Sequence, residues 1–231
     1  MKKDILLISS THGNEKIGLE VIEKLKKEKL DKYFDYIIAN PKANKQDKRF
    51  LDKDLNRSYP GKKESKFYEE KVAYKNFQIA KKYKYVIDIH EAEKGINDFV
   101  IVARDSLNDK FPYKKINLKN ILLWSDPKGS LCGEIDNAIE LEFGMKGRNR
   151  VDVINKAYNI LEMFLLNKII RYSKSKKIYK VYGFLNDNKF VSRKVFKDFK
   201  KVNFKNESFY PLLVDQYLDL GIKCYKMNKI K

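Results

Sequence analysis

The sequence predicts an α/β fold with a mixed, mostly parallel sheet flanked by helices. Short apolar, β-branched runs alternate with segments whose apolar residues recur at helical spacing, which is typical of a sheet between helices. The chain has 231 residues, 43% of them hydrophobic, which is enough for a real core. From Lys177 onward the pattern changes to short aromatic strands. We therefore expect an α/β domain over residues 1–172 and a small β-rich subdomain over residues 177–231.

Each predicted element rests on a local pattern. Short apolar runs bounded by polar residues predict the strands, and apolar residues at helical spacing predict the helices. The strands are expected at 5–8, 33–40, 85–90, 98–103, 120–124, 138–144, 178–184 and 209–214. The helices are expected at 17–25, 73–80 and 154–165. A long polar loop over residues 42–64 follows the second strand, and such a loop is usually functional or disordered.

The charge of the chain allows two interpretations. Its formal net charge is +19, which is compatible with a nucleic-acid-binding surface. However, the basic residues are 43 Lys and only 7 Arg, and the Lys residues are scattered along the whole chain. Because Arg is the usual side chain for reading bases and clamping phosphates, we favour a solvated basic surface and expect no nucleic-acid partner.

Cysteine content and the N-terminus bear on the compartment. Cys132 and Cys224 show no CxxC or other metal-binding spacing, so free thiols in a reducing cytosol are expected. The apolar run at residues 5–8 is too short for a signal peptide or a membrane span. We therefore expect a soluble, cytoplasmic protein without a membrane partner.

The chain has only two histidines, and each follows an apolar run that predicts a strand. His12 comes just after the first run, His90 ends the third, and Glu142 lies at the end of a later one. Because ligands bind at the carboxyl ends of parallel strands, these side chains are expected at one edge of the sheet. The polar loop also leaves a strand end and carries four more candidates: Arg49, Asp54, Asn56 and Arg57.

Two imidazoles and a carboxylate are the ligand set of a catalytic zinc site that keeps an open position. His12 and Glu15 lie three residues apart. Both can point at one ion if a helix begins near Asn14 and Gly13 allows a tight turn. His90 would join them from a neighbouring strand. One Zn²⁺ per chain is therefore the expected cofactor.

A metal-dependent hydrolase also needs a base, a cation for the oxyanion and contacts to its substrate. Glu140 and Glu142 share one face of a predicted strand, so alternation alone does not choose the base between them. Arg49 is the candidate for the oxyanion. The Asn56-Arg57 pair suits capture of a substrate carboxylate, which Arg binds through two hydrogen bonds.

Four motifs occur along the first part of the chain. They are HGNEKIG (12–18), NPKANKQDKRFLDKDLNRSYPG (40–61), IDIH (87–90) and ELEFG (140–144). In this order they resemble the succinylglutamate desuccinylase/aspartoacylase family, part of the wider zinc carboxypeptidase-like group, over roughly residues 1–165. The resemblance implies a mixed α/β sheet of the zinc carboxypeptidase type with a C-terminal β-domain that shapes the pocket. The aromatic tail looks like a reduced form of that domain.

The resemblance also implies a role for each matching residue. Glu142, which precedes an apolar residue and Gly as in the family, would be the general base rather than Glu140. Arg49 would polarise the scissile carbonyl. Asp54 would orient the loop by bonding to its backbone or to Arg57. The zinc ligands would be His12, Glu15 and His90, and the carboxylate of the amino-acid product would be held by Asn56 and Arg57.

Two further residues are candidates by position. Asp88 lies two residues before His90 and could orient that histidine, although strand alternation also fits a plain buried polar residue. Arg104 could bind a carboxylate on the acyl group. It lies in the segment 95–136, which carries no motif that matches the family.

These observations predict a zinc-dependent amidohydrolase that cleaves an N-acyl amino acid by metal-activated water with a Glu base. The alternative is a metallocarboxypeptidase that removes a C-terminal residue from a short peptide, since the same site serves both. A β-domain that caps the cleft would exclude long peptides. A non-catalytic basic binding protein is a further hypothesis, but it leaves the clustered His, Glu and Arg positions unexplained. The acyl group, the amino acid and the oligomeric state are not predicted.

Overall fold

The computed structural model describes most of the chain. The described residues are 3–95, 97–103, 111–124, 129–168, 176–188 and 195–231. Arg104, the candidate for an acyl carboxylate, lies outside them.

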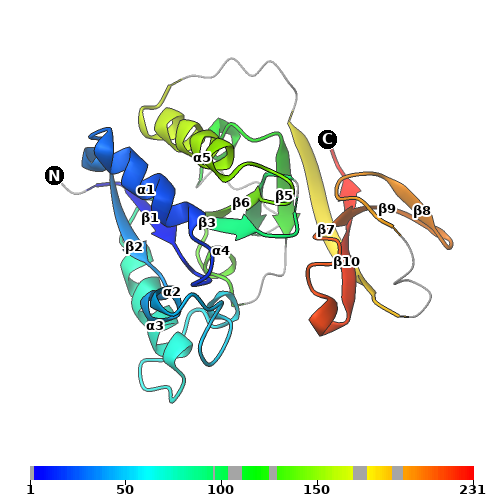
Figure 1. Cartoon of the computed structure of the whole chain (residues 1–231), viewed down its shortest axis with the longest axis horizontal. Coiled ribbons are helices and arrows are strands. Elements are labelled where there is room, and N and C mark those ends of the chain that lie inside the picture. Colours follow the sequence, from blue (N-terminus) through cyan, green and yellow to red (C-terminus); the bar gives the residue numbers. More distant parts are fainter. Residues whose placement is uncertain (1–2, 96, 104–110, 125–128, 169–175, 189–194) are drawn as a thin grey trace.

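One sheet of ten strands runs through the described part of the chain (Figure 1). From β2 to β7, neighbouring strands pair in parallel except β6 and β4, and the pairs beyond β7 are antiparallel. The predicted class, a mostly parallel sheet flanked by helices with a β-rich end, is confirmed. The strands in spatial order are β2 (Phe34–Ile38), β1 (Ile5–Ser9), β3 (Tyr85–Ala92), β6 (Ala138–Gly144), β4 (Phe99–Ala103), β5 (Asn120–Trp124), β7 (Lys177–Asn186), β10 (Ile222–Lys229), β9 (Glu207–Leu212) and β8 (Val202–Phe204).

Helices cover both faces of the sheet. α1 (Ile17–Lys27) and α5 (Arg150–Leu165) lie side by side on one face, and α3 (Tyr68–Ala80) lies on the other (Figure 1). Each helix presents an apolar stripe to the strands, and two apolar clusters, one on each side, form the core. The remaining helical segments are short: α2 (Pro41–Lys45), α4 (Leu131–Glu134) and the 3₁₀ turns Asp31–Tyr33, Leu55–Arg57, Tyr113–Lys115 and Leu218–Leu220.

Strand alternation decides which face carries the polar residues. In β3, Ile87 and Ile89 pack into the cluster beneath α1 and α5. In β6, Ile139 and Leu141 do the same. Because successive side chains of a strand point to opposite faces, the residues that alternate with these apolar ones point to the other side of the sheet. Those residues are Asp88, His90, Glu140 and Glu142.

The C-terminal strands continue the sheet. β7 pairs in parallel with β5, and β10 and β9 then follow in antiparallel order. The division into domains 1–172 and 177–231 stays a prediction. Sequence patterns missed β8, β10, α2 and α4, since each is short or lacks a continuous apolar run.

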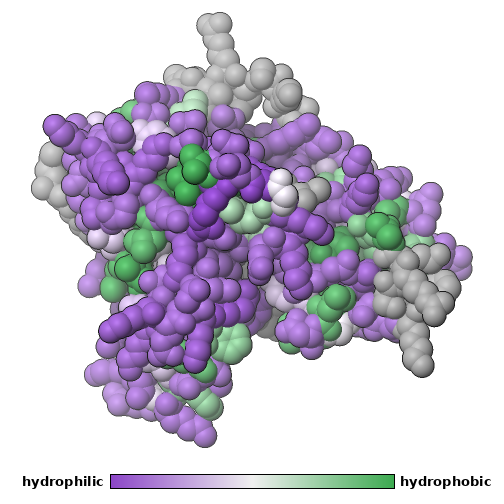
Figure 2. Space-filling model, in the orientation of Figure 1, coloured by the Kyte–Doolittle hydropathy of each residue, from purple (hydrophilic) through white to green (hydrophobic). Residues whose placement is uncertain are grey.

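The outer surface is largely polar. The view in Figure 2 is mostly hydrophilic, with small, separate apolar patches. This follows from a chain with 35% charged residues whose large apolar side chains fill the two clusters. None of the helices described is both long and apolar enough to cross a membrane.

The long polar loop is held by one buried carboxylate. Glu69, which is fully buried on α3, accepts hydrogen bonds from three successive backbone N–H groups, those of Leu51, Asp52 and Lys53, at 2.7, 3.0 and 3.2 Å. It also accepts from Asn40 Nδ2 at 3.2 Å. A carboxylate can satisfy several donors at once, so this one side chain fixes the loop to the domain.

We expect Glu69→Ala to lower the free energy of unfolding by about 3 kcal/mol, because it leaves buried backbone donors without an acceptor. Urea denaturation followed by circular dichroism measures this. Glu64→Ala, at an exposed position in the same loop, is the matched control and is expected to change little. Equal stability of the two variants would show that the loop does not depend on Glu69.

Candidate active site

The parallel pairing of β1 and β3 brings the two histidines together. Ser9, the last residue of β1, pairs with Ile89, and His90 follows directly in β3. His12 lies three residues beyond Ser9, in the loop that leaves the same end of the sheet. The ring centroids of the two histidines are 5.3 Å apart. The predicted meeting of the two histidines at one sheet edge is therefore what the structure shows.

The loop after β1 fits tightly against the long polar loop. The N–H of Gly13 donates to Arg49 O at 3.0 Å. A Cβ atom at Gly13 would lie only 2.2 Å from the backbone of Ala43. Gly13 lies in the expected tight turn, which is closed by the hydrogen bond from Glu15 N–H to His12 O at 3.0 Å. Its φ is not positive, so a glycine is required there by the close approach of two backbones. The helix also begins later than expected, at Ile17 and not near Asn14.

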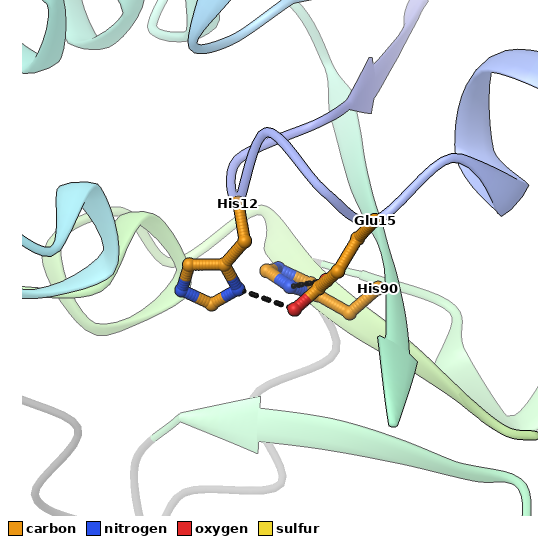
Figure 3. A group of neighbouring side chains, drawn as sticks. All are labelled: His12, Glu15 and His90. Carbon is orange, nitrogen blue, oxygen red and sulfur yellow. Dashed lines mark hydrogen bonds and ion pairs between the residues drawn. The ribbon is translucent and has the colours of Figure 1, made fainter. Parts of the chain in front are cut away.

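His12, Glu15 and His90 form a compact, buried cluster (Figure 3). Glu15 Oε1 lies 2.6 Å from His12 Nδ1, and Glu15 Oε2 lies 3.1 Å from His90 Nδ1. The three side chains belong to residues that are 5%, 8% and 1% exposed. Among the described residues they are the one group of three or more His, Cys, Asp or Glu whose ligand atoms converge, all within 4.8 Å of one another.

The charges of this cluster are strongly coupled. Burial raises the pKa of Glu15, but His12 and His90 outweigh burial and the pKa is lowered overall. Burial lowers the pKa of His90, but the carboxylates of Asp88 and Glu15 outweigh it and the pKa is raised well above its usual value. Both Nδ1 atoms thus face an ionised carboxylate, and a cation between the three groups would satisfy the same charge. Two imidazoles and a carboxylate are a donor set that suits zinc.

A second carboxylate lies behind each imidazole. Asp54 Oδ1 is 3.0 Å from His12 Nε2. Asp88 Oδ2 is 3.1 Å from His90 Nε2, although without the angle of a hydrogen bond, and Asp88 also accepts from the Thr11 hydroxyl. Contacts of this kind hold the orientation and tautomer of a ligating histidine and leave its other nitrogen to the metal. The geometry agrees with the orienting role considered for Asp88.

Asp54 connects the polar loop to the cluster. Its carboxylate accepts from the N–H of Asn56 at 2.8 Å and so caps the 3₁₀ turn that carries Asn56 and Arg57. This is the backbone bond that the resemblance implied. Its arginine partner is Arg49, whose Nη2 lies 3.4 Å away, and not Arg57. Arg49 Nη1 is also 3.5 Å from Glu15 Oε1, so Arg49 lies at the rim of the cluster.

The two strand carboxylates have different surroundings. Glu140 Oε1 accepts from Asn56 Nδ2 at 3.3 Å and from Cys132 Sγ at 3.1 Å. Glu142 pairs with His90 across β6 and β3, and no donor from the described residues contacts its carboxylate. Burial, together with the charges of Glu15 and Glu140, raises the pKa of Glu142 to about 8 against the opposing effect of the histidines.

A small inner cavity of about 30 Å³ lies beside the cluster. Arg49, Asn56 and Arg57 line it on the loop side, and Glu140 and Glu142 line it on the sheet side. A larger cavity of about 470 Å³ opens next to it, and Arg49 lines both. The loop side and the sheet side of the predicted site therefore meet around one space.

Five residues that line the inner cavity were not found from the sequence: Ile101, Trp124, Ser130, Leu213 and Tyr217. Trp124 ends β5, and Leu213 and Tyr217 come from the C-terminal region. Tyr217 lines both cavities, and burial raises the pKa of its hydroxyl. The chain has 15 Tyr and no local pattern marks this one, so only the folded structure identifies it.

Comparison with known sequences points to one family. A model of the "Succinylglutamate desuccinylase/Aspartoacylase catalytic domain" matches residues 1–166. A probable aspartoacylase from Prochlorococcus marinus subsp. pastoris is 37% identical in an alignment of 83 residues that covers 34% of this chain and 28% of that protein. Another, from Prochlorococcus marinus strain MIT 9215, is 30% identical in an alignment of 124 residues that covers 46% of this chain and 40% of that protein. The matched segments thus span less than half of either relative.

The fold is also similar to solved structures. The succinylglutamate desuccinylase from Chromobacterium violaceum superposes with a TM-score of 0.76 at 17% identity, covering 99% of this chain and 85% of the other. Murine aminoacylase 3 gives a TM-score of 0.76 at 17% identity, covering 99% and 95%. At this level of identity the likeness establishes a shared fold.

Proposed function

The chain belongs to the succinylglutamate desuccinylase/aspartoacylase family, and from this premise we propose that it hydrolyses the amide bond of an N-acyl amino acid. The observation that carries the proposal is the convergence of His12, Glu15 and His90 beside the carboxylate of Glu142, to which none of the described residues donates. Metal ligands and a free base in one buried space are the parts that hydrolysis of an amide requires.

The metal would be Zn²⁺, held by His12 Nδ1, Glu15 and His90 Nδ1. The two Nδ1 atoms that face Glu15 support this assignment, as do Asp54 and Asp88 behind the opposite ring nitrogens. When bound, the ion supplies the Lewis acidity that makes a water molecule nucleophilic near neutral pH and polarises a carbonyl.

Protein side chains then transfer the proton and stabilise the negative charge on the carbonyl oxygen. Glu142 takes a proton from the attacking water and delivers it to the leaving amine. Burial raises the pKa of its carboxyl, which makes the carboxylate a stronger base. Arg49 stabilises the negative charge that develops on the carbonyl oxygen, since its guanidinium lies at the rim of the cluster. Glu140 is less suited as the base because Asn56 and Cys132 already engage its carboxylate.

A carboxylate on the amino acid would bind at Arg57. The Arg57 side chain lines the inner cavity and is held in place by a bond from Nη1 to Asn56 O at 2.7 Å. Asn56 was assigned to the same carboxylate from the sequence. Since its Nδ2 already donates to Glu140, Arg57 carries this contact in our proposal.

Deacylation of a small substrate fits the cavity better than trimming of a long peptide. Leu213 and Tyr217, both from the C-terminal region, help to line the inner cavity. Its volume of about 30 Å³ is enough for a small group only. The carboxypeptidase alternative predicts faster cleavage of peptides than of N-acyl amino acids, which a direct comparison of rates would reveal.

Protein purified without a His tag is expected to contain about one zinc per chain, and the His12→Ala, His90→Ala double variant none. Elemental analysis after gel filtration gives the metal content, and circular dichroism checks that the variant is folded. If the parent binds no metal even after dialysis against zinc, the hydrolase proposal fails and the basic binding protein becomes the leading hypothesis.

Glu142→Gln is expected to lower kcat by about 10²- to 10⁴-fold, because Gln has the same shape but accepts no proton. Its zinc content should equal that of the parent, which separates loss of the base from loss of the metal. Glu23→Gln, on the outer side of α1, is the matched control. Near-normal turnover by Glu142→Gln would assign the base to another residue.

Arg57→Ala is expected to lower kcat/KM for N-acetylnorvaline by about 10- to 100-fold, since a charged hydrogen-bond partner of the carboxylate is lost. Cleavage of N-acetylbutylamine, which lacks only the carboxylate, should be slow in the parent and unchanged in the variant. Lys62→Ala, at an exposed loop position, serves as control. An equal loss for both substrates would mean that Arg57 does not bind the carboxylate.

A further inference from the structure

Glu140 is a buried carboxylate that the proposed mechanism does not use. It is 3% exposed and lies two residues before Glu142 on the same face of β6. It pairs with Asp88 of β3 on one side and with Ile101 of β4 on the other. Glu140 therefore lies one step deeper in the sheet than the base and lines the inner cavity from below.

The hydrogen bonds of Glu140 leave one oxygen free. Asn56 Nδ2 and Cys132 Sγ both donate to Oε1, at 3.3 and 3.1 Å. Among the residues that the structure describes, no donor contacts Oε2, and no Lys, Arg or His lies within ion-pair distance of the carboxylate. Burial of a carboxylate without a cation is costly, so a hydrogen-bond donor from a bound ligand would stabilise the Glu140 carboxylate.

A second buried acceptor lies beside the first. The bond from Asn56 Nδ2 to Glu140 fixes the orientation of the Asn56 amide, because a carboxylate accepts and does not donate. Among the described residues, Asn56 Oδ1 is then left buried without a hydrogen-bond partner. Asn56 is 7% exposed and lines the same cavity. The inner cavity is thus lined by two residues, Glu140 and Asn56, that each have an acceptor oxygen without a donor among the described residues.

Part of the lining of this narrow cavity is apolar. Ile101, Trp124 and Leu213 line it together with the charged and polar side chains. With about 30 Å³ of space, it accommodates a short stem with one polar end. Arg57, the proposed anchor of the carboxylate, lines the same cavity. An amino acid held by Arg57 would therefore lie in the same cavity as Glu140.

We propose that Glu140 selects N-acyl amino acids whose short side chain ends in an ammonium group or another N–H donor. This inference rests on the proposed function and names the class of its substrate. The ammonium would donate to Glu140 Oε2 and to Asn56 Oδ1, while the apolar lining residues contact its methylene groups. Amino acids with a side-chain carboxylate are disfavoured, because a second negative charge would be buried against Glu140.

The test measures binding of the free amino-acid product, which does not depend on the unknown acyl group. Calorimetry on the zinc-loaded parent compares 2,4-diaminobutyrate, its neutral isostere norvaline, glutamate and the longer lysine. Binding of 2,4-diaminobutyrate is expected to be tighter than that of norvaline by about 10- to 100-fold, and glutamate and lysine should bind more weakly.

Glu140→Gln is the diagnostic variant. Its amide oxygen can keep the contacts to Asn56 and Cys132, while its NH₂ replaces the free acceptor, so the core is disturbed little. The preference for 2,4-diaminobutyrate over norvaline should disappear, whereas Glu23→Gln should retain it. Thermal unfolding confirms that the variant is folded, and Glu140→Ala, which removes the carboxylate altogether, should lose the same preference.

The outcomes separate the two proposals. Tightest binding of glutamate or norvaline by the parent, no binding of any probe, or an unchanged preference in Glu140→Gln would overturn the role of Glu140. Turnover is measured in parallel with the N-formyl, N-acetyl and N-succinyl derivatives of all four amino acids. Hydrolysis that favours a carboxylate side chain supports the proposed function and overturns this inference. The expected binding preference without any hydrolysis overturns the proposed function and leaves the amine-binding pocket in place.

Discussion

The Glu15 carboxylate lies between the Nδ1 atoms of two buried histidines, 2.6 Å from His12 and 3.1 Å from His90. Burying three titratable groups is costly unless each is paired, and here the Glu15 carboxylate pairs with both imidazoles. The N–H of Glu91 adds a further bond to Glu15 Oε2 at 3.1 Å. The arrangement needs β1, β3 and the start of α1 in their native places, so the cluster depends on the whole α/β layer and could not form from a local segment.

The surrounding side chains and loops hold the contacts of Glu15 with His12 and His90 in place. Asp54 and Asp88 hold the outer ring nitrogens, and Asp54 is in turn part of the long polar loop. Glu69 holds the same loop through three backbone N–H groups, and Gly13 allows it to approach the first histidine. A loop of this length would otherwise be mobile. Here its contacts to buried carboxylates make it a rigid wall of the site.

The inner cavity is polarised from one wall to the other. Arg49 and Arg57 line the loop side, whereas Glu140 and Glu142 line the sheet side. A ligand with a carboxylate at one end and a donor at the other would match both walls. The C-terminal region completes the cavity through Leu213 and Tyr217, so the proposed preference for small substrates and the proposed selection of amines both rest on contacts between segments far apart in the sequence.

The sequence by itself determined the fold class, the order of the longer helices and of most strands, and the motif residues around the cluster, because apolar periodicity and short motifs are local properties. It also placed His12, His90 and Glu142 at one sheet edge, since parallel strands share that edge. Tertiary structure alone decided what these patterns left open: the free carboxylate of Glu142 against the engaged one of Glu140, the Asp54–Arg49 pair and the contribution of Tyr217. Such contacts join residues with no fixed spacing, and only packing determines which of many similar side chains meet.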